Sequence, residues 1–300
     1  MSASTPPTID PGVNSGSIQA GTGATPPVAT VASYPTTPGR FPREAMVCAR
    51  RQIIKMFRLP ELMAFNLLQP LLFILLFAYV FAGAIGGGAE GRDDYREFMM
   101  AGFFAQCILF ATVSSSATNI AQDMHKGMMD RFRSLPMTRG AVLTGRTIAD
   151  FVQNVMMLLM MIVMALIVGW RIHEGFLKAL AGFGVILFLA YSFSWVGAAI
   201  GTMVRTPEAA AGVVVILFPL TMLSNALVPP STLPRVLQHV VNWNPYSATV
   251  QSARELFGNE APASDSWPMQ NATLASLGWS VLIILVFRTI AVRRYRGVSR

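Results

Sequence analysis

One segment between two long apolar runs carries the side chains best suited to ionic chemistry. Two carboxylates and three cations lie within Asp123–Pro136, on a stretch that is compatible with a helix until Pro136 ends it. Such a segment suits docking of a partner protein. The alternative is that its cations only set orientation or contact anionic lipid headgroups. We expect the docking residues to be Asp123, Lys126, Gly127, Asp130, Arg131, Phe132, Arg133, Leu135 and Pro136.

Motifs for catalysis and for ligand binding are missing from the sequence. A phosphate-binding loop needs a lysine that follows glycine and precedes serine or threonine, but the three lysines are followed by Met56, Gly127 and Ala179. The histidines are scattered without a zinc motif, and Cys48 and Cys107 have no metal-ligand spacing. We therefore expect no catalytic residue, metal or cofactor in this chain, and no enzyme activity of its own.

The composition indicates a membrane protein. Hydrophobic residues make up 53% of the 300 residues and charged residues only 13%. Ordinary globular domains carry about 25% charged residues. Several apolar runs approach the ~20 residues that cross a bilayer as a helix. The net charge of +8 could suggest nucleic-acid binding, but the cations adjoin the apolar runs, so we expect no nucleic-acid partner.

Six apolar runs are predicted to span the membrane in an all-α fold. Residues 1–39, rich in Pro, Thr, Ser, Gly and Ala, are expected to form a disordered tail before a membrane domain at 40–300. Arg40–Arg58 is predicted to be a basic amphipathic helix in the membrane interface, with a solvated helix as the alternative. The predicted spans are about 62–81, 98–118, 148–168, 176–200, 209–228 and 272–288.

The connecting segments carry further expectations. Gly83–Glu97 is predicted to be a loop, and Trp170 to be an interfacial anchor at the turn 169–175. Residues 229–271 are too polar to span, so we expect two short amphipathic helices there, around 236–241 and 248–257, at the outer face.

The distribution of cations predicts the orientation of the chain. If both termini lie inside the cell, the inner segments hold 17 of the 23 Lys and Arg residues, and the three outer loops hold 6. Cytoplasmic loops of membrane proteins carry such an excess, so we expect both termini and the docking segment to face the cytoplasm.

Two groups of residues carry a family resemblance over about residues 41–295. The first is Asp123, Gly127, Asp130 and the basic-apolar run 131–135 ending at Pro136, with Asp at the first position where the family more often has Glu. The second is Leu227-Val228-Pro229, Leu233-Pro234, Asn244-Pro245 and Arg254. In this order they make the chain resemble the permease subunits of type-2 ABC exporters, close to the daunorubicin-resistance permeases of actinobacteria.

The resemblance implies half of a transporter in the bacterial cytoplasmic membrane. Such a permease pairs with a second copy or a paralogue, contacts membrane lipid, and binds separate ABC ATPase subunits that hold the ATP and Mg. It also implies an interfacial connecting helix, a cytoplasmic coupling helix at 120–136 and re-entrant helices before the sixth span. ATP-driven closure of the ATPases would push the coupling helix and tilt the spans as rigid bodies.

Polar side chains in the predicted spans one, two and five are candidates for the substrate path, although bonding between helices is the commoner use of such groups. An uncharged lining suits a hydrophobic or amphiphilic drug or lipid, with a polysaccharide or glycolipid exporter as the alternative. An ion-coupled secondary transporter would need a carboxylate inside the membrane, and Asp150 is expected near the cytoplasmic interface. A lipid-modifying enzyme would need an acid, base or nucleophile cluster. The candidate path residues are Asn66, Gln69, Gln106, Thr221, Ser224 and Asn225.

Overall fold

The computed structural model describes residues 46–47, 50, 54, 60–81, 89–125, 139–204, 206–226, 233–259, 261 and 264–297. Regular structure within these residues is entirely helical, which confirms the all-α prediction. The elements are α2 (Pro60–Leu75), the π-helical η1 (Leu76–Phe81), α4 (Ala89–His125), α6 (Arg139–Val168), α7 (Phe176–Met203), α8 (Pro207–Val215), α9 (Phe218–Met222), α10 (Arg235–Trp243), α11 (Pro245–Phe257), α12 (Trp267–Gln270) and α13 (Ala272–Gly297).

Among the described residues, four helices are long and apolar enough to cross a bilayer. They contain the predicted spans two, three, four and six: Tyr95–His125, Leu143–Val168, Phe176–Met203 and Ala272–Arg294. The first predicted span coincides with α2 and η1, which hold the shorter apolar stretch Leu68–Val80. The fifth falls on α8 and α9. The chain is therefore a helical membrane protein with four candidate spans, and the count of six stays a prediction.

The predicted fifth span is broken in the middle. Pro219 has no N–H and cannot bond the carbonyl of Val215, so the α-helical pattern ends there. The N–H of Ile216 bonds the carbonyl of Val213 at 3.1 Å, and that of Leu217 bonds Val214 at 3.0 Å, as in a tighter turn. Residues 223–226 form a further bend and turn, and the next described residue is Leu233.

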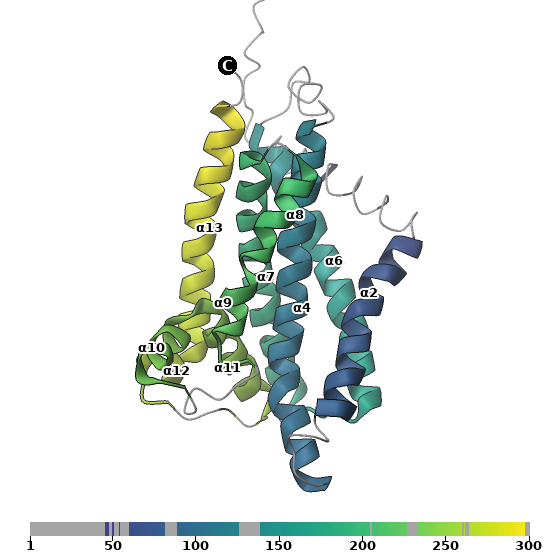
Figure 1. Cartoon of the computed structure of the whole chain (residues 1–300), viewed down its shortest axis with the longest axis vertical. Coiled ribbons are helices and arrows are strands. Elements are labelled where there is room, and N and C mark those ends of the chain that lie inside the picture. The colour runs from purple at the N-terminus through teal and green to yellow at the C-terminus, as the bar shows by residue number, and fades with distance from the viewer. Residues whose placement is uncertain are drawn as a thin grey trace, which may run out of the picture. The chain divides into compact units, whose positions relative to one another are not determined.

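The centre of the bundle is the pair α4 and α7. Helix α7 packs against α4, α13, α11 and α6, and Figure 1 shows α4 and α7 between α13 and α6. A Cβ atom at Gly197 would lie 2.7 Å from Cβ of Ser116, and one at Gly201 would lie 2.7 Å from the carbonyl oxygen of Ala117. These glycines are four residues apart on one face, so the two backbones approach as in other small-residue contacts between membrane helices.

Two expectations for the connecting segments are wrong. The predicted loop at Gly83–Glu97 is helical from Ala89 onward, so the α4 helix begins well before the apolar run. Trp170 is buried instead of interfacial, with its ring edge-to-face to Phe104 at 5.3 Å and to Phe257 at 5.4 Å. Gly169 has a φ of 104°, and the N–H of Trp170 bonds the carbonyl of Ala165 at 2.9 Å, so the chain folds back over the end of α6.

Several predictions fall on residues that the structure does not describe. The predicted tail 1–39 lies outside them entirely. Of the predicted interfacial helix Arg40–Arg58, only Met46, Val47, Arg50 and Ile54 are described, and all four are helical and exposed.

The two short helices expected after residue 229 are present as α10 and α11, followed by α12. Helix α10 is amphipathic, with Val236, Val240 and Trp243 on its exposed side. Helix α11 also has a polar and an apolar face, but Tyr246–Arg254 is buried, so it does not lie at a surface. Its neighbours are α4, α7 and α13, which surround it. Whether these helices re-enter the bilayer stays a prediction.

Candidate functional site

The predicted docking segment begins at the described end of α4. Asp123 lies in the last turn of this helix, and Nη1 of Arg146 on α6 donates to its Oδ2 atom at 3.2 Å. Both side chains are largely shielded, so the pair joins α4 to α6 at this end. The remaining predicted docking residues, Lys126, Gly127, Asp130, Arg131, Phe132, Arg133, Leu135 and Pro136, lie outside the described residues.

A buried carboxylate follows Arg146 by one turn of α6. Asp150 is 4% exposed and accepts hydrogen bonds from the hydroxyls of Ser115 and Ser116 on α4. The amide of Asn119 donates to Oγ of Ser115 at 3.0 Å and holds that hydroxyl in place. The sequence predicted Asp150 near an interface, and the structure places it in the contact between two candidate spans, where its hydrogen bonds offset part of the cost of burial.

Helix α11 and the residue before it present a polar face to the bent segment 223–226. Asn244, Ser247, Gln251 and Arg254 follow one another at intervals of three or four residues, which places them on one side of a helix. The amide of Asn244 donates to the carbonyl of Leu223 at 2.8 Å. Oγ of Ser247 accepts the N–H of Asn225 at 3.2 Å, and Gln251 accepts the side-chain amide of Asn225.

Arg254 is the last member of this polar face, and its side chain is completely buried. Its guanidinium donates to three carbonyl oxygens: Phe98 at 2.7 Å, Asn225 at 2.9 Å and Ala226 at 2.8 Å. The central carbon of the guanidinium also lies 3.8 Å from the ring centroid of Phe98. The aromatic ring and the three carbonyls therefore stabilise the buried positive charge together. Burial lowers the pKa of Arg254 to about 9, which leaves the group charged at neutral pH.

The contacts of α11 continue onto α4 and α13. The hydroxyl of Tyr246 donates to the carbonyl of Gly102 at 2.6 Å. On the side toward α13, Thr249 bonds Ser276 and Ser252 bonds Thr273. Irregular backbone inside a membrane protein must find its hydrogen bonds within the protein, and α11 supplies them for residues 223–226. These bonds fix the segment 223–226 against α11, which is itself bonded to α4 and α13.

The predicted substrate-path residues divide into two groups. Thr221, Ser224 and Asn225 lie together in the chain after Pro219, and all three are buried. Ser224 donates to the carbonyl of Thr221, and Asn225 bonds Gln251, so these groups serve contacts within the bundle. Gln106 is half-buried on α4 and Gln69 is exposed on α2, while the side chain of Asn66 lies outside what the structure describes.

Sequence reasoning missed most of the α11 cluster. Arg254 was noted only as part of a family pattern, and Ser247 and Gln251 were not singled out. The signal was present, because polar side chains at 244, 247, 251 and 254 share one helical face in a region bounded by apolar runs.

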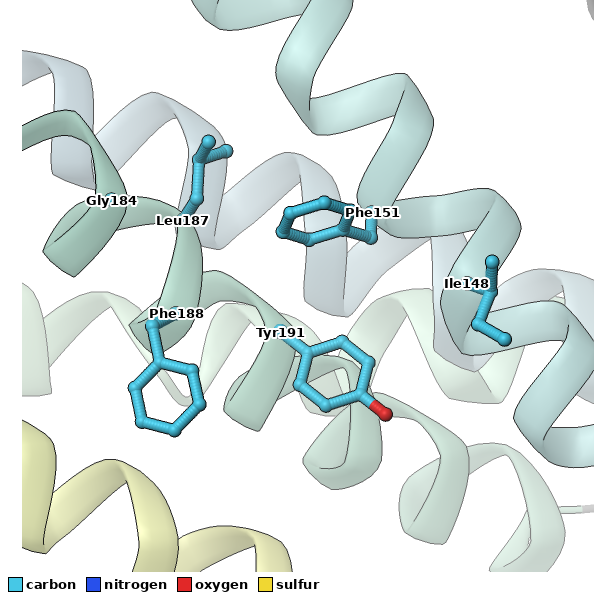
Figure 2. Close-up of a pocket in the computed structure, with 6 residues that line it drawn as sticks. All are labelled: Ile148, Phe151, Gly184, Leu187, Phe188 and Tyr191. Atoms are coloured by element: carbon cyan, nitrogen blue, oxygen red, sulfur yellow. The ribbon is translucent and has the colours of Figure 1, made fainter. Parts of the chain in front are cut away.

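A second feature, the α6–α7 groove, is a cavity of about 370 Å³ between those two helices. It is open on one side. Figure 2 shows Phe151 of α6 and Tyr191 of α7 facing each other across it. Their rings are edge-to-face with centroids 6.2 Å apart. The lining residues are Ile148, Phe151, Gly184, Leu187, Phe188 and Tyr191.

Comparisons with known proteins agree with a transporter. The family of ABC-2 type transporters matches residues 43–257. The chain is 33% identical, over 231 residues, to the "Daunorubicin resistance ABC transporter permease protein DrrB1" of Streptomyces coeruleorubidus, which covers 77% of this chain and 78% of that relative. It is 22% identical, over 263 residues, to the "Putative transport permease ycf38" of Cyanophora paradoxa, covering 87% of this chain and 90% of that protein.

Proposed function

Because the chain belongs to the ABC-2 type transporter family, we propose that it is the membrane-spanning permease subunit of an ATP-driven exporter. The observation that carries this proposal is the family match, which extends from the basic N-terminal segment to the end of α11. ATP and Mg bind to separate ABC ATPase subunits in this proposal, since no lysine of the chain stands in a phosphate-binding loop. A second permease copy or a paralogue completes the transporter.

The proposed cargo is a hydrophobic or amphiphilic drug or lipid. One relative is named for daunorubicin resistance. The described polar groups of the predicted path agree with such a cargo, because Thr221, Ser224 and Asn225 are buried and two of them are bonded within the bundle. A charged polysaccharide would need many free polar partners along its route, which makes it the less suitable cargo.

The proposed point of coupling to the ATPase is the segment 123–136, on the cytoplasmic side. Its first residue, Asp123, pairs with Arg146, so a push on this segment reaches α4 and α6 together. Arg131 and Arg133 are proposed to pair with acidic residues of the ATPase, and Phe132 and Leu135 to fill an apolar pocket on it.

Co-purification tests the proposed assembly. The tagged chain, extracted from native membranes in mild detergent, should retain an ATP-hydrolysing subunit. The double variant Arg131→Glu with Arg133→Glu should lose that subunit, whereas Arg235→Glu, an exposed arginine of α10, should keep it. Retention of the ATPase by the double variant would refute the docking assignment. Absence of any ATPase from the wild-type preparation would refute the exporter.

Orientation and cargo have their own measurements. A cysteine introduced at position 131 should be labelled by a membrane-impermeant thiol reagent only after the cells are opened, and labelling from the medium would overturn the topology. Inside-out vesicles containing the whole complex should accumulate daunorubicin when ATP is present. Movement of a charged polysaccharide without daunorubicin would favour the alternative cargo.

One observation favours a second candidate function, ion-coupled transport. Asp150 is a buried carboxylate inside a candidate span, which is the feature that such a transporter requires. Its bonds to two serines and the nearby Arg146 also suit a purely structural group. Transport that continues without ATP and stops when the proton gradient is collapsed would establish the second function and exclude the first.

A further inference from the structure

We propose that the α6–α7 groove binds one acyl chain of a membrane lipid. This site lies between two candidate spans, and none of its lining residues belongs to α11 or to the predicted docking residues. The proposal depends on the chain being a membrane protein, and it holds whichever cargo or energy source the transporter uses.

The chemistry of the groove selects an apolar ligand. Five of its six lining residues have no polar side-chain atom, and the sixth, Tyr191, contributes a single hydroxyl. None of the described lining residues is charged. An amphiphilic drug with a charged amine would have to give up the hydration of that amine without gaining a counter-charge. A hydrocarbon chain has no hydration to lose when it enters the groove.

The shape of the groove selects an extended ligand. Gly184, Leu187, Phe188 and Tyr191 follow one another along a single face of α7, and this face is about 10 Å long at 1.5 Å per residue. Phe151 stands opposite Tyr191 and narrows the space between the helices. At the other end, a Cβ atom built on Gly184 would meet nothing within 4 Å, so this glycine leaves the slot open.

The surroundings show where the ligand comes from. The exposed apolar side chains of α6 beyond the groove include Leu159, Met160 and Val163, and those of α7 include Leu177 and Leu180. Both helices are candidate membrane spans, so these apolar faces contact lipid. The open side of the groove is continuous with this surface, and lipid chains are the hydrocarbon present there at high concentration.

Photo-crosslinking tests the site directly. The full chain is reconstituted in phosphatidylglycerol–phosphatidylethanolamine vesicles that contain a phospholipid with a diazirine midway along one acyl chain. After irradiation, peptide mass spectrometry maps the adducts. We expect the peptides around 148–151 and 184–191 to carry more label than the exposed face of α13 at Leu282 and Leu285. Uniform labelling of all exposed helix faces would overturn the proposal.

A matched pair of variants sharpens the test. Gly184→Phe places a ring in the slot without a backbone clash and should lower labelling of the groove peptides about fivefold or more, the ratio that corresponds to ~1 kcal/mol. Gly278→Phe makes the same change at an exposed glycine of α13 that also meets nothing within 4 Å, and it should leave the groove labelling unchanged. Unchanged labelling in Gly184→Phe would overturn the proposal.

Two competing occupants give distinct results. If a transported amphiphile fills the groove, added daunorubicin will displace the lipid label from the wild-type chain. If a second copy of the chain covers it, bifunctional crosslinking will join position 187 of one copy to another copy, and the lipid label will be absent. Either result would overturn the proposal. Both measurements use the wild-type chain or Leu187→Cys, so they do not depend on whether Gly184→Phe folds.

Discussion

Replacing Arg254 should destabilise the fold more than any other single polar substitution in α11. Arg254→Met keeps most of the apolar stem and removes three donors, so the carbonyls of Phe98, Asn225 and Ala226 stay buried without those bonds. The Phe98 carbonyl keeps its place in the hydrogen-bond ladder of α4, whereas the Asn225 and Ala226 carbonyls lie outside any helix. Each unpaired buried acceptor costs roughly 1–3 kcal/mol, and removal of the buried charge returns part of this, so we expect a net loss of about 2–4 kcal/mol. For a chain of this size that is a fall in Tm of about 10 °C.

The assay is thermal unfolding in detergent, followed by the fluorescence of the buried Trp170 and Trp195. Arg254→Lys keeps a cation but cannot reach three carbonyls in two segments from one compact ammonium group, so its Tm should lie between those of the wild type and Arg254→Met. Arg235→Met, an exposed arginine of α10, is the matched control and should change Tm little. A loss below ~1 kcal/mol for Arg254→Met would refute the reasoning that the three carbonyls depend on this side chain.

Three other predictions concern packing, a buried hydroxyl and an ion pair. Gly201→Leu should cost about 3 kcal/mol or more, because its Cβ would lie 2.7 Å from a backbone oxygen of α4. Gly212→Leu is the control, because the space around Gly212 is open, and it should change the stability little. Equal Tm values for the two variants would contradict the close contact at Gly201. Tyr246→Phe should cost about 1 kcal/mol at neutral pH, because it removes the buried hydrogen bond to the Gly102 carbonyl. Burial raises the pKa of Tyr246 well above 10.0, so this contribution should be constant below pH 10 and fall only at higher pH. The difference in unfolding free energy between the wild type and Tyr246→Phe should therefore shrink above pH 10, and a constant difference would contradict the buried hydroxyl. Asp123→Arg and Arg146→Asp should each destabilise the α4–α6 contact, and combining them should restore about 0.5–1 kcal/mol in a double-mutant cycle; strictly additive losses would show that the pair contributes nothing.

The fold could be predicted where a long apolar run fixes a helix by itself. The fourth predicted span, 176–200, matches α7 (Phe176–Met203) within three residues, because Gly175 and the polar Thr202 onward bound a continuous apolar stretch. The prediction was wrong at the start of α4, because the sequence there is polar and glycine-rich, while the structure is helical from Ala89. Composition could not show that Trp170 turns inward, since that depends on the φ of Gly169 and on the rings it meets.

The site was harder to predict than the fold, because its key contacts join distant parts of the chain. Arg254 bonds Phe98 across 156 residues and Ala226 across 28. Spacing along α11 identifies a polar face but not its partner, and the partner is backbone, which carries no sequence signal. The same reason explains Asp150, whose two serine donors lie on another helix.

The glycine contact between α4 and α7 restricts how the bundle can change shape. With no side chain between the backbones at Gly197 and Gly201, a small separation of the two helices would open a gap too narrow for lipid or water to enter, and the attraction across it would be lost at once. Sliding is equally unfavourable, since neighbouring residues are too large for the same hollows. These two helices should therefore move together as one rigid unit, and any rearrangement of the bundle should occur at their contacts with the other helices.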